Sequence, residues 1–170
     1  GTDGKDCIRF NVPEADGQQN PYYEQYITLV GGAEYQVSYK YKVVCEGANR
    51  YAAPTVKLEF FSDLDLPGAK RLGERYVHPD NNTLMADGEW HTYTQKIYPD
   101  TNVFDVKVMV RSLAAGVNMN DSTTVYIDDV EIVMTRPPKP LELKTDAIFY
   151  YSDEVVTEGK NGIITTSIDT

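Results

Sequence analysis

Residue types that build catalytic and metal centres are scarce in this chain. Its 170 residues include two histidines, two cysteines and one tryptophan. The two histidines, His78 and His91, do not have the spacing of a metal-binding pair. The sequence has no Gly-x-Ser-x-Gly nucleophile elbow, phosphate-binding loop or dinucleotide fingerprint. We therefore expect a non-catalytic protein with no catalytic residues of its own.

Positive charge and long hydrophobic runs are also lacking. Lys and Arg number 16 against 26 Asp and Glu, which gives a formal net charge of −10 at pH 7. A protein that binds nucleic acid needs a basic face to displace counterions from the phosphates, so nucleic acid is not expected as a partner. No apolar run is long enough for a membrane-spanning helix, so no membrane span is expected.

The two cysteines, Cys7 and Cys45, are too few for a disulfide scaffold. They would pair in an oxidising compartment if their side chains met. The strand pattern puts Cys45 on the core-facing side and Cys7 on the opposite face of its own strand. This favours two free thiols over one bridge, and both alternatives stay open at this point.

The abundant residues are those of β-sheets. There are 13 tyrosines against five phenylalanines, and tyrosine and β-branched residues suit pleated, half-buried surfaces. Apolar and polar residues alternate with a period of two, which is the mark of a strand with one buried face. The expected strands are residues 7–12, 22–29, 35–43, 56–61, 90–97, 106–111 and 125–134, with a short strand near 75–77 in the long loop 63–87.

Proline divides the chain into unequal parts. Residues 1–135 carry the strand pattern of one β-sandwich. Residues 136–140 hold three prolines, which cannot continue a central strand and predict a stiff linker. Residues 141–170 are again strand-like but too short to bury a core alone. We expect them to form a β-hairpin extension or the start of a further domain.

Four segments in order resemble the jelly-roll carbohydrate-binding modules of families four, nine and twenty-two. They are residues 4–10, 32–42, 87–93 and 124–132. The resemblance implies an all-β, jelly-roll β-sandwich of the galactose-binding-domain-like kind. It implies a non-catalytic module of a larger secreted or cell-surface, glycan-active protein, which targets a tethered catalytic domain to polysaccharide. The family's usual first strand, with its Asn-Gly and Phe-Glu signature, is missing.

The resemblance also implies a structural calcium ion. Its side-chain ligand in these families lies in the Asp-Asp pair of the last strand, which corresponds to Asp128 or Asp129, helped by backbone carbonyls near Lys5. Oxygen ligands of this kind suit Ca²⁺. The alternative is that the two aspartates cap a strand end or pair with lysine.

The family binds glycans along the concave face of one sheet, so residues opposite the core are the candidate ligands. Strand parity gives a set in which cations predominate: Lys40, Lys42, Lys57, Glu59, Phe61, Lys107 and Arg111. We expect these residues to share one basic groove that favours acidic or sulfated glycans. The alternative is a solvated face with Lys–Glu pairs between strands.

Aromatic rings on loops and strand ends are the second group of candidates, because sugar rings stack on them. They are Tyr22, Tyr23, Tyr51, Tyr76 and Tyr126. In contrast, we expect Tyr35, Tyr39 and Tyr41 to pack in the core and Trp90 to be structural. The alternative function is a structural or interaction spacer of a multi-modular cell-surface protein with no sugar site.

Overall fold

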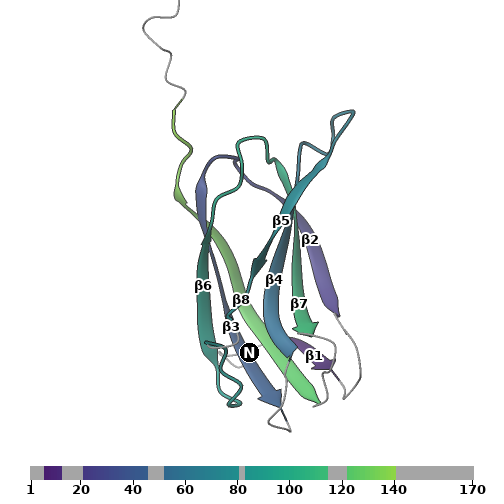
Figure 1. Ribbon diagram of the computed structural model, residues 1–170, viewed down its shortest axis with the longest axis vertical. Helices are drawn as coiled ribbons and strands as arrows, with labels where there is room; N and C mark the ends of the chain where they lie inside the picture. Colours follow the sequence, from purple (N-terminus) through teal and green to yellow (C-terminus); the bar gives the residue numbers. More distant parts are fainter. Residues whose placement is uncertain (1–5, 13–20, 46–51, 81–82, 115–121, 141–170) are drawn as a thin grey trace, which may run out of the picture. The chain divides into compact units, whose positions relative to one another are not determined.

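The computed structural model describes residues 6–12, 21–45, 52–80, 83–114 and 122–140, and within these ranges every regular element is a β-strand. Eight strands form two antiparallel four-stranded sheets that face each other (Figure 1). Sheet A has the order β1-β8-β3-β6, and sheet B has the order β2-β7-β4-β5. The strands are β1 (Ile8–Val12), β2 (Tyr22–Thr28), β3 (Glu34–Cys45), β4 (Ala52–Phe61), β5 (Arg71–Val77), β6 (His91–Ile97), β7 (Asp105–Ala114) and β8 (Thr123–Arg136).

This strand order is that of a jelly roll, which wraps eight strands into two sheets. Each connection between successive strands crosses to the other sheet, except the one from β4 to β5. The all-β, jelly-roll prediction is confirmed. Each strand expected from the period-two pattern is present, with ends that differ by a few residues. The strand near residue 75 is longer than expected, because β5 begins at Arg71 and pairs with most of β4.

The core lies between the sheets and is built by the alternation itself. On β3, Tyr35, Val37, Tyr39 and Tyr41 are all buried, as expected for core-facing tyrosines. Val56 and Leu58 of β4 and Val106 of β7 meet them from sheet B. Burial of these side chains supplies the main favourable free energy of folding.

One core side chain also joins the sheets by hydrogen bonds. The Tyr39 hydroxyl lies 3.0 Å from the carbonyl oxygens of Pro54, near the start of β4, and Val77, at the end of β5, which are close together in this antiparallel pair of sheet B. The ring itself is 1% exposed. A buried phenol needs a hydrogen-bond partner, and here that requirement fixes how β3 sits over sheet B.

A β-bulge interrupts β8 at its acidic pair. The register of β3 against β8 shifts between Ser38 and Lys40, and Asp129 takes a left-handed backbone conformation with φ of 49°. Aspartate tolerates this conformation better than most residues. The extra residue shifts the alternation by one position, so that the core-facing residues are Val125 and Ile127 before the bulge and Val130 and Ile132 after it.

The chain divides into two compact units, residues 1–139 and 140–170. The predicted hairpin at 141–170 lies outside the described residues. Cys7 and Cys45 are free thiols in the structure. No helix in the described part of the chain could cross a membrane.

Candidate functional site

The predicted basic groove is divided between two surfaces. Lys40 and Lys42 lie on β3 in sheet A, whereas Lys57 and Lys107 lie on β4 and β7 in sheet B. The prediction of one shared floor is therefore wrong. Parity along each strand was predicted correctly, but the jelly-roll connection moves the chain to the other sheet between residues 45 and 52, and a period-two pattern does not record which sheet a strand joins.

The larger group of candidates shares the outer face of sheet B. Strand partners in register point to the same side of a sheet, and Val56, Leu58, Val106 and Val108 point into the core. Their sequence neighbours therefore point outward. We call this surface the sheet B face; its residues are Tyr22, Glu24, Tyr26, Thr55, Lys57, Glu59, Phe61, Glu74, Tyr76, Lys107, Met109 and Arg111.

Ion pairs cover the middle of the sheet B face. The Lys57 ammonium lies 2.8 Å from carboxylate oxygens of both Glu59 and Glu74. The Lys107 ammonium lies 3.2 Å from Glu59 and 3.8 Å from Glu24. The face therefore has the Lys–Glu pairs of the alternative interpretation, and its lysines do not create a general positive field.

These pairs change the proton affinity of their members. The hydrogen bond from Lys57 is the main cause that holds the pKa of the Glu59 carboxyl below its usual range, and it also lowers the pKa of Glu74. Burial alone would lower the pKa of Lys57, but its hydrogen bonds to Glu59, Glu74 and Tyr76 raise it above the usual value. The middle of the face is thus a set of fully charged donors and acceptors at neutral pH.

Exposed aromatic rings flank this charged floor. Tyr22 and Tyr26, both on β2, are 52% and 51% exposed, and Tyr76 on β5 is 37% exposed. The rings of Tyr26 and Phe61 lie 6.3 Å apart between centroids. In contrast, Lys57 in the floor is 9% exposed, with its ammonium 5.2 Å from the Tyr76 ring centroid. The face thus combines solvent-exposed aromatic rings with charged groups that are largely buried between them.

The predicted residues of sheet A form a separate cluster. The Lys42 ammonium lies 4.7 Å from the ring centroid of Tyr126 and 5.4 Å from that of Trp90. Lys40 makes an ion pair of 2.6 Å with Asp129. Because Lys42 already covers both rings, this cluster offers less open aromatic surface than the sheet B face does.

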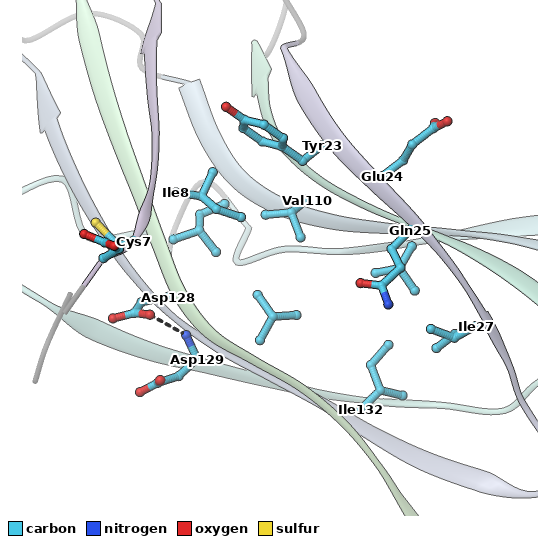
Figure 2. A pocket seen from close by; sticks show the side chains of 14 residues that line it. Cys7, Ile8, Tyr23, Glu24, Gln25, Ile27, Val110, Asp128, Asp129 and Ile132 are labelled. Carbon is cyan, nitrogen blue, oxygen red and sulfur yellow. Dashed lines mark hydrogen bonds between the residues drawn. The ribbon is translucent and has the colours of Figure 1, made fainter.

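Tyr23 lies apart from both surfaces and lines a cavity of about 730 Å³ between the edges of the two sheets. Figure 2 shows Ile8, Val110 and Ile132 pointing into this cavity, with Asp128 and Asp129 near Cys7 at one side. The Tyr23 ring lies 5.8 Å from that of buried Phe10. The lining combines apolar side chains with carboxylates and the Gln25 amide, but Tyr23 is its one aromatic ring, so it offers less surface for stacking a sugar chain than the sheet B face does.

The predicted calcium ligands have other partners in the structure. Asp128 accepts a hydrogen bond of 2.9 Å from the backbone N–H of Asp129, and the Asp129 carboxylate holds Lys40. Across the ranges that the structure describes, no group of three or more His, Cys, Asp or Glu side chains could hold a metal ion. The pair thus supplies at most part of a calcium site, and Lys5 lies outside the described residues.

Sequence reasoning missed several members of the sheet B face. Tyr26, Glu24 and Glu74 were not among the candidates, although Tyr26 has the parity of Tyr22 four residues earlier on the same strand. The glutamates had no signal in the sequence, since their role depends on which strands lie beside β2 and β5. Tyr51, a predicted ligand, lies outside the described residues.

No family model matches this chain, and no curated protein is similar to it. Solved structures similar to it include a family 4 carbohydrate-binding module (CBM4), at 20% identity and a TM-score of 0.40, over 67% of this chain and 61% of that one. The CBM22-1–GH10 modules of Clostridium thermocellum xylanase 10B have 19% identity and a TM-score of 0.39, over 75% and 20%. Tailspike protein 4 of bacteriophage CBA120 has 12% identity and a TM-score of 0.48, over 75% and 15%.

Two of these neighbours carry modules of families that the sequence resembles, four and twenty-two. This chain spans less than two thirds of each of the three neighbours. All three TM-scores lie below 0.5.

Proposed function

We propose that this protein is a non-catalytic carbohydrate-binding module that binds polysaccharide through the sheet B face. The observation that carries the proposal is the pair of half-exposed rings, Tyr22 and Tyr26, beside a floor of charged hydrogen-bonding groups. Exposed rings that gather on one face indicate an interaction site, whereas singly exposed rings need no explanation.

The chemistry of this face matches that of a sugar chain. A pyranose ring has apolar C–H faces that stack on a tyrosine, while its hydroxyls need both donors and acceptors. Lys57 and Lys107 are donors, and Glu59 is an acceptor between them, at 2.8 and 3.2 Å. Because these groups are held by each other, they are already oriented before a glycan arrives.

The ion pairs also argue against the floor lysines as the source of the predicted preference for acidic glycans. Each lysine of the floor has two glutamate partners, so attraction of an anionic polymer through them would require breaking existing pairs. A preference for acidic sugars needs instead a cation that has no carboxylate partner in this face.

The wider role follows from the binding function. Such a module raises the local concentration of a tethered catalytic domain on its substrate without taking part in the chemistry. We place the protein outside the cell or on its surface, where polysaccharide is met. A Ca²⁺ ion held by Asp128 and Asp129 would stabilise the β8 bulge, in competition with Lys40.

The ion-pair network favours one other function, that of a spacer or interaction domain whose polar face is satisfied internally. The exposed tyrosines distinguish the two, because a spacer has no need of them. Affinity electrophoresis and calorimetry against a panel of neutral and acidic polysaccharides test this directly. Retardation by none of them would establish the spacer and remove the glycan proposal.

The role of the rings is tested by the variants Tyr22→Ala and Tyr26→Ala. An aromatic contact is worth about 0.5–1.5 kcal/mol, so each change should weaken glycan binding roughly 2- to 12-fold. Tyr98→Ala is the matched control, because Tyr98 is 60% exposed but lies outside the sheet B face. Equal affinity of all three variants and the wild type would show that the glycan binds elsewhere.

A further inference from the structure

We propose that Arg111 is the anchor for a ligand carboxylate, so that the sheet B face binds a glycan containing uronic acid residues. This inference rests on the proposed glycan-binding function. It assigns a role to the single arginine in the middle strands of that face, β7 and β4.

Within the ranges that the structure describes, Arg111 is a buried cation with no ion-pair partner. The residue is 8% exposed, and its Nε atom is buried with no hydrogen-bond partner. Among the residues that the structure describes, no carboxylate forms an ion pair with its guanidinium. Buried charges in proteins are normally paired and hydrogen-bonded, because an unpaired one loses its hydration without compensation.

The glutamates of the same face are engaged with other cations. Glu24 pairs with Lys107, at 3.8 Å. Glu59 and Glu74 are held by Lys57 and also lie against Arg71. The face thus satisfies each of its other cations internally and leaves this guanidinium without an anion, which is the pattern expected where a ligand supplies the charge.

The position of Arg111 suits a sugar acid. In the sheet register, Arg111 lies opposite Tyr22 on one side and Thr55 on the other. Side chains directly opposite each other have Cβ atoms about 5 Å apart, close to the width of a sugar ring. A uronic acid stacked on the exposed Tyr22 ring therefore brings its carboxylate, one bond from the ring, toward the guanidinium.

Carboxylate is the chemical group that best fits this side chain. Guanidinium is planar and binds carboxylate through two parallel N–H···O hydrogen bonds. A neutral hydroxyl would accept one hydrogen bond and leave the charge without a counterion. The ligand class is thus a polyuronate, rather than the general set of acidic and sulfated polymers.

The test compares two polymers that differ only in their carboxylates. Polygalacturonate and its carboxyl-reduced form are titrated against the 170-residue protein by calorimetry, with dextran sulfate as a third ligand. Arg111→Met removes the charge at similar volume, and Arg111→Lys keeps the charge but loses the planar, two-hydrogen-bond geometry. Arg71→Met is the matched control, because it removes a cation from the edge strand β5, beside the sheet B face, where Arg71 already has glutamate partners.

We expect the wild type to prefer polygalacturonate over the reduced polymer by at least tenfold. Arg111→Met should abolish that preference, with a much smaller loss of affinity for the reduced polymer, whose hydroxyl accepts only one hydrogen bond from the guanidinium. Arg111→Lys should lose most of the preference. Arg71→Met should keep it. The melting temperature of Arg111→Met should equal or exceed that of the wild type, because an unpaired buried charge has been removed.

Three results would overturn the assignment of Arg111 while leaving the glycan-binding function in place. They are equal wild-type affinity for the two galacturonan forms, a preference that survives Arg111→Met, and tighter binding of dextran sulfate than of polygalacturonate. Loss of all binding in the wild type would instead refute the glycan-binding function itself, and with it the ground for this inference.

Discussion

The hydroxyl of Tyr39 provides a test of how the two sheets are held together. Tyr39→Phe removes one oxygen and leaves the ring in the core. In the wild type that hydroxyl lies 3.0 Å from two carbonyl oxygens, of Pro54 and Val77. Its single hydrogen serves both acceptors, so the variant leaves buried acceptors of sheet B without this donor.

The size of the effect follows from that geometry. Leaving a buried polar group unsatisfied costs about 1–3 kcal/mol. The ring volume hardly changes, so no cavity term is added. For a sandwich of this size the melting temperature should fall by roughly 3–5 °C for each kcal/mol lost.

Alkaline pH gives the same hydroxyl a second, independent signature. Burial, reinforced by the neighbouring Tyr93 and Tyr41, raises the pKa of Tyr39 far above its usual value. The unfolded chain releases this proton near pH 10, while the folded chain keeps it. The raised pKa therefore leaves the free energy of unfolding unchanged below pH 10. Above pH 10 the free energy of unfolding falls by up to about 1.4 kcal/mol per pH unit.

Urea unfolding of wild type and Tyr39→Phe at pH 7 and pH 11 measures both effects. The variant should be less stable at pH 7, with an unchanged m-value, and the difference should shrink or reverse at pH 11. Tyr98→Phe, at an exposed site, should match the wild type at both. A Tyr39→Phe protein within 0.5 kcal/mol of wild type at pH 7, with the same difference at pH 11, would refute this reasoning.

Two other predictions concern the charged groups. Because the pKa of Glu59 is lowered in the fold, its stabilising effect is complete above the unfolded pKa near 4.3 and is lost as pH falls through the lower, folded value. The free energy of unfolding of Glu59→Gln should thus be about 1–2 kcal/mol lower than that of the wild type at pH 7, and the two should differ little in acid. Thermal melts across this pH range measure the difference. A difference that is the same at every pH would contradict the prediction. For calcium, a free ion concentration 100 times its Kd should stabilise the fold by about 2.7 kcal/mol relative to protein in chelator. Asp128→Asn with Asp129→Asn should remove that gain, and identical melts with and without Ca²⁺ would exclude the site.

The alternation of apolar and polar residues with a period of two predicted most of the fold from the sequence. It located the strands and placed Tyr35, Tyr39 and Tyr41 in the core, because a strand with one buried face must alternate whatever its neighbours are. The four jelly-roll segments in order then indicated the sandwich. The low count of His and Cys is the basis for expecting no catalytic centre built from those residues.

What the sequence did not contain is which strands lie side by side. Lys40 and Lys57 each alternate with core-facing residues along their own strands, so the sequence pattern treats them alike. The two strands nevertheless belong to different sheets. Pairing between strands is a long-range event that local patterns do not encode. Only the register of β2, β7, β4 and β5 gives each lysine of the sheet B face its glutamates and leaves Arg111 without one.

The sequence by itself thus determined the class of fold, the buried face of each strand and the residue types available for binding. The tertiary structure decided which of those residues meet, because the energy of a charged or aromatic side chain depends on neighbours that come from distant parts of the chain. Tyr22 shows the difference. Its sequence position marks it as an aromatic residue beside a loop, and only the register of β2 against β7 places it opposite Arg111 in the proposed binding face.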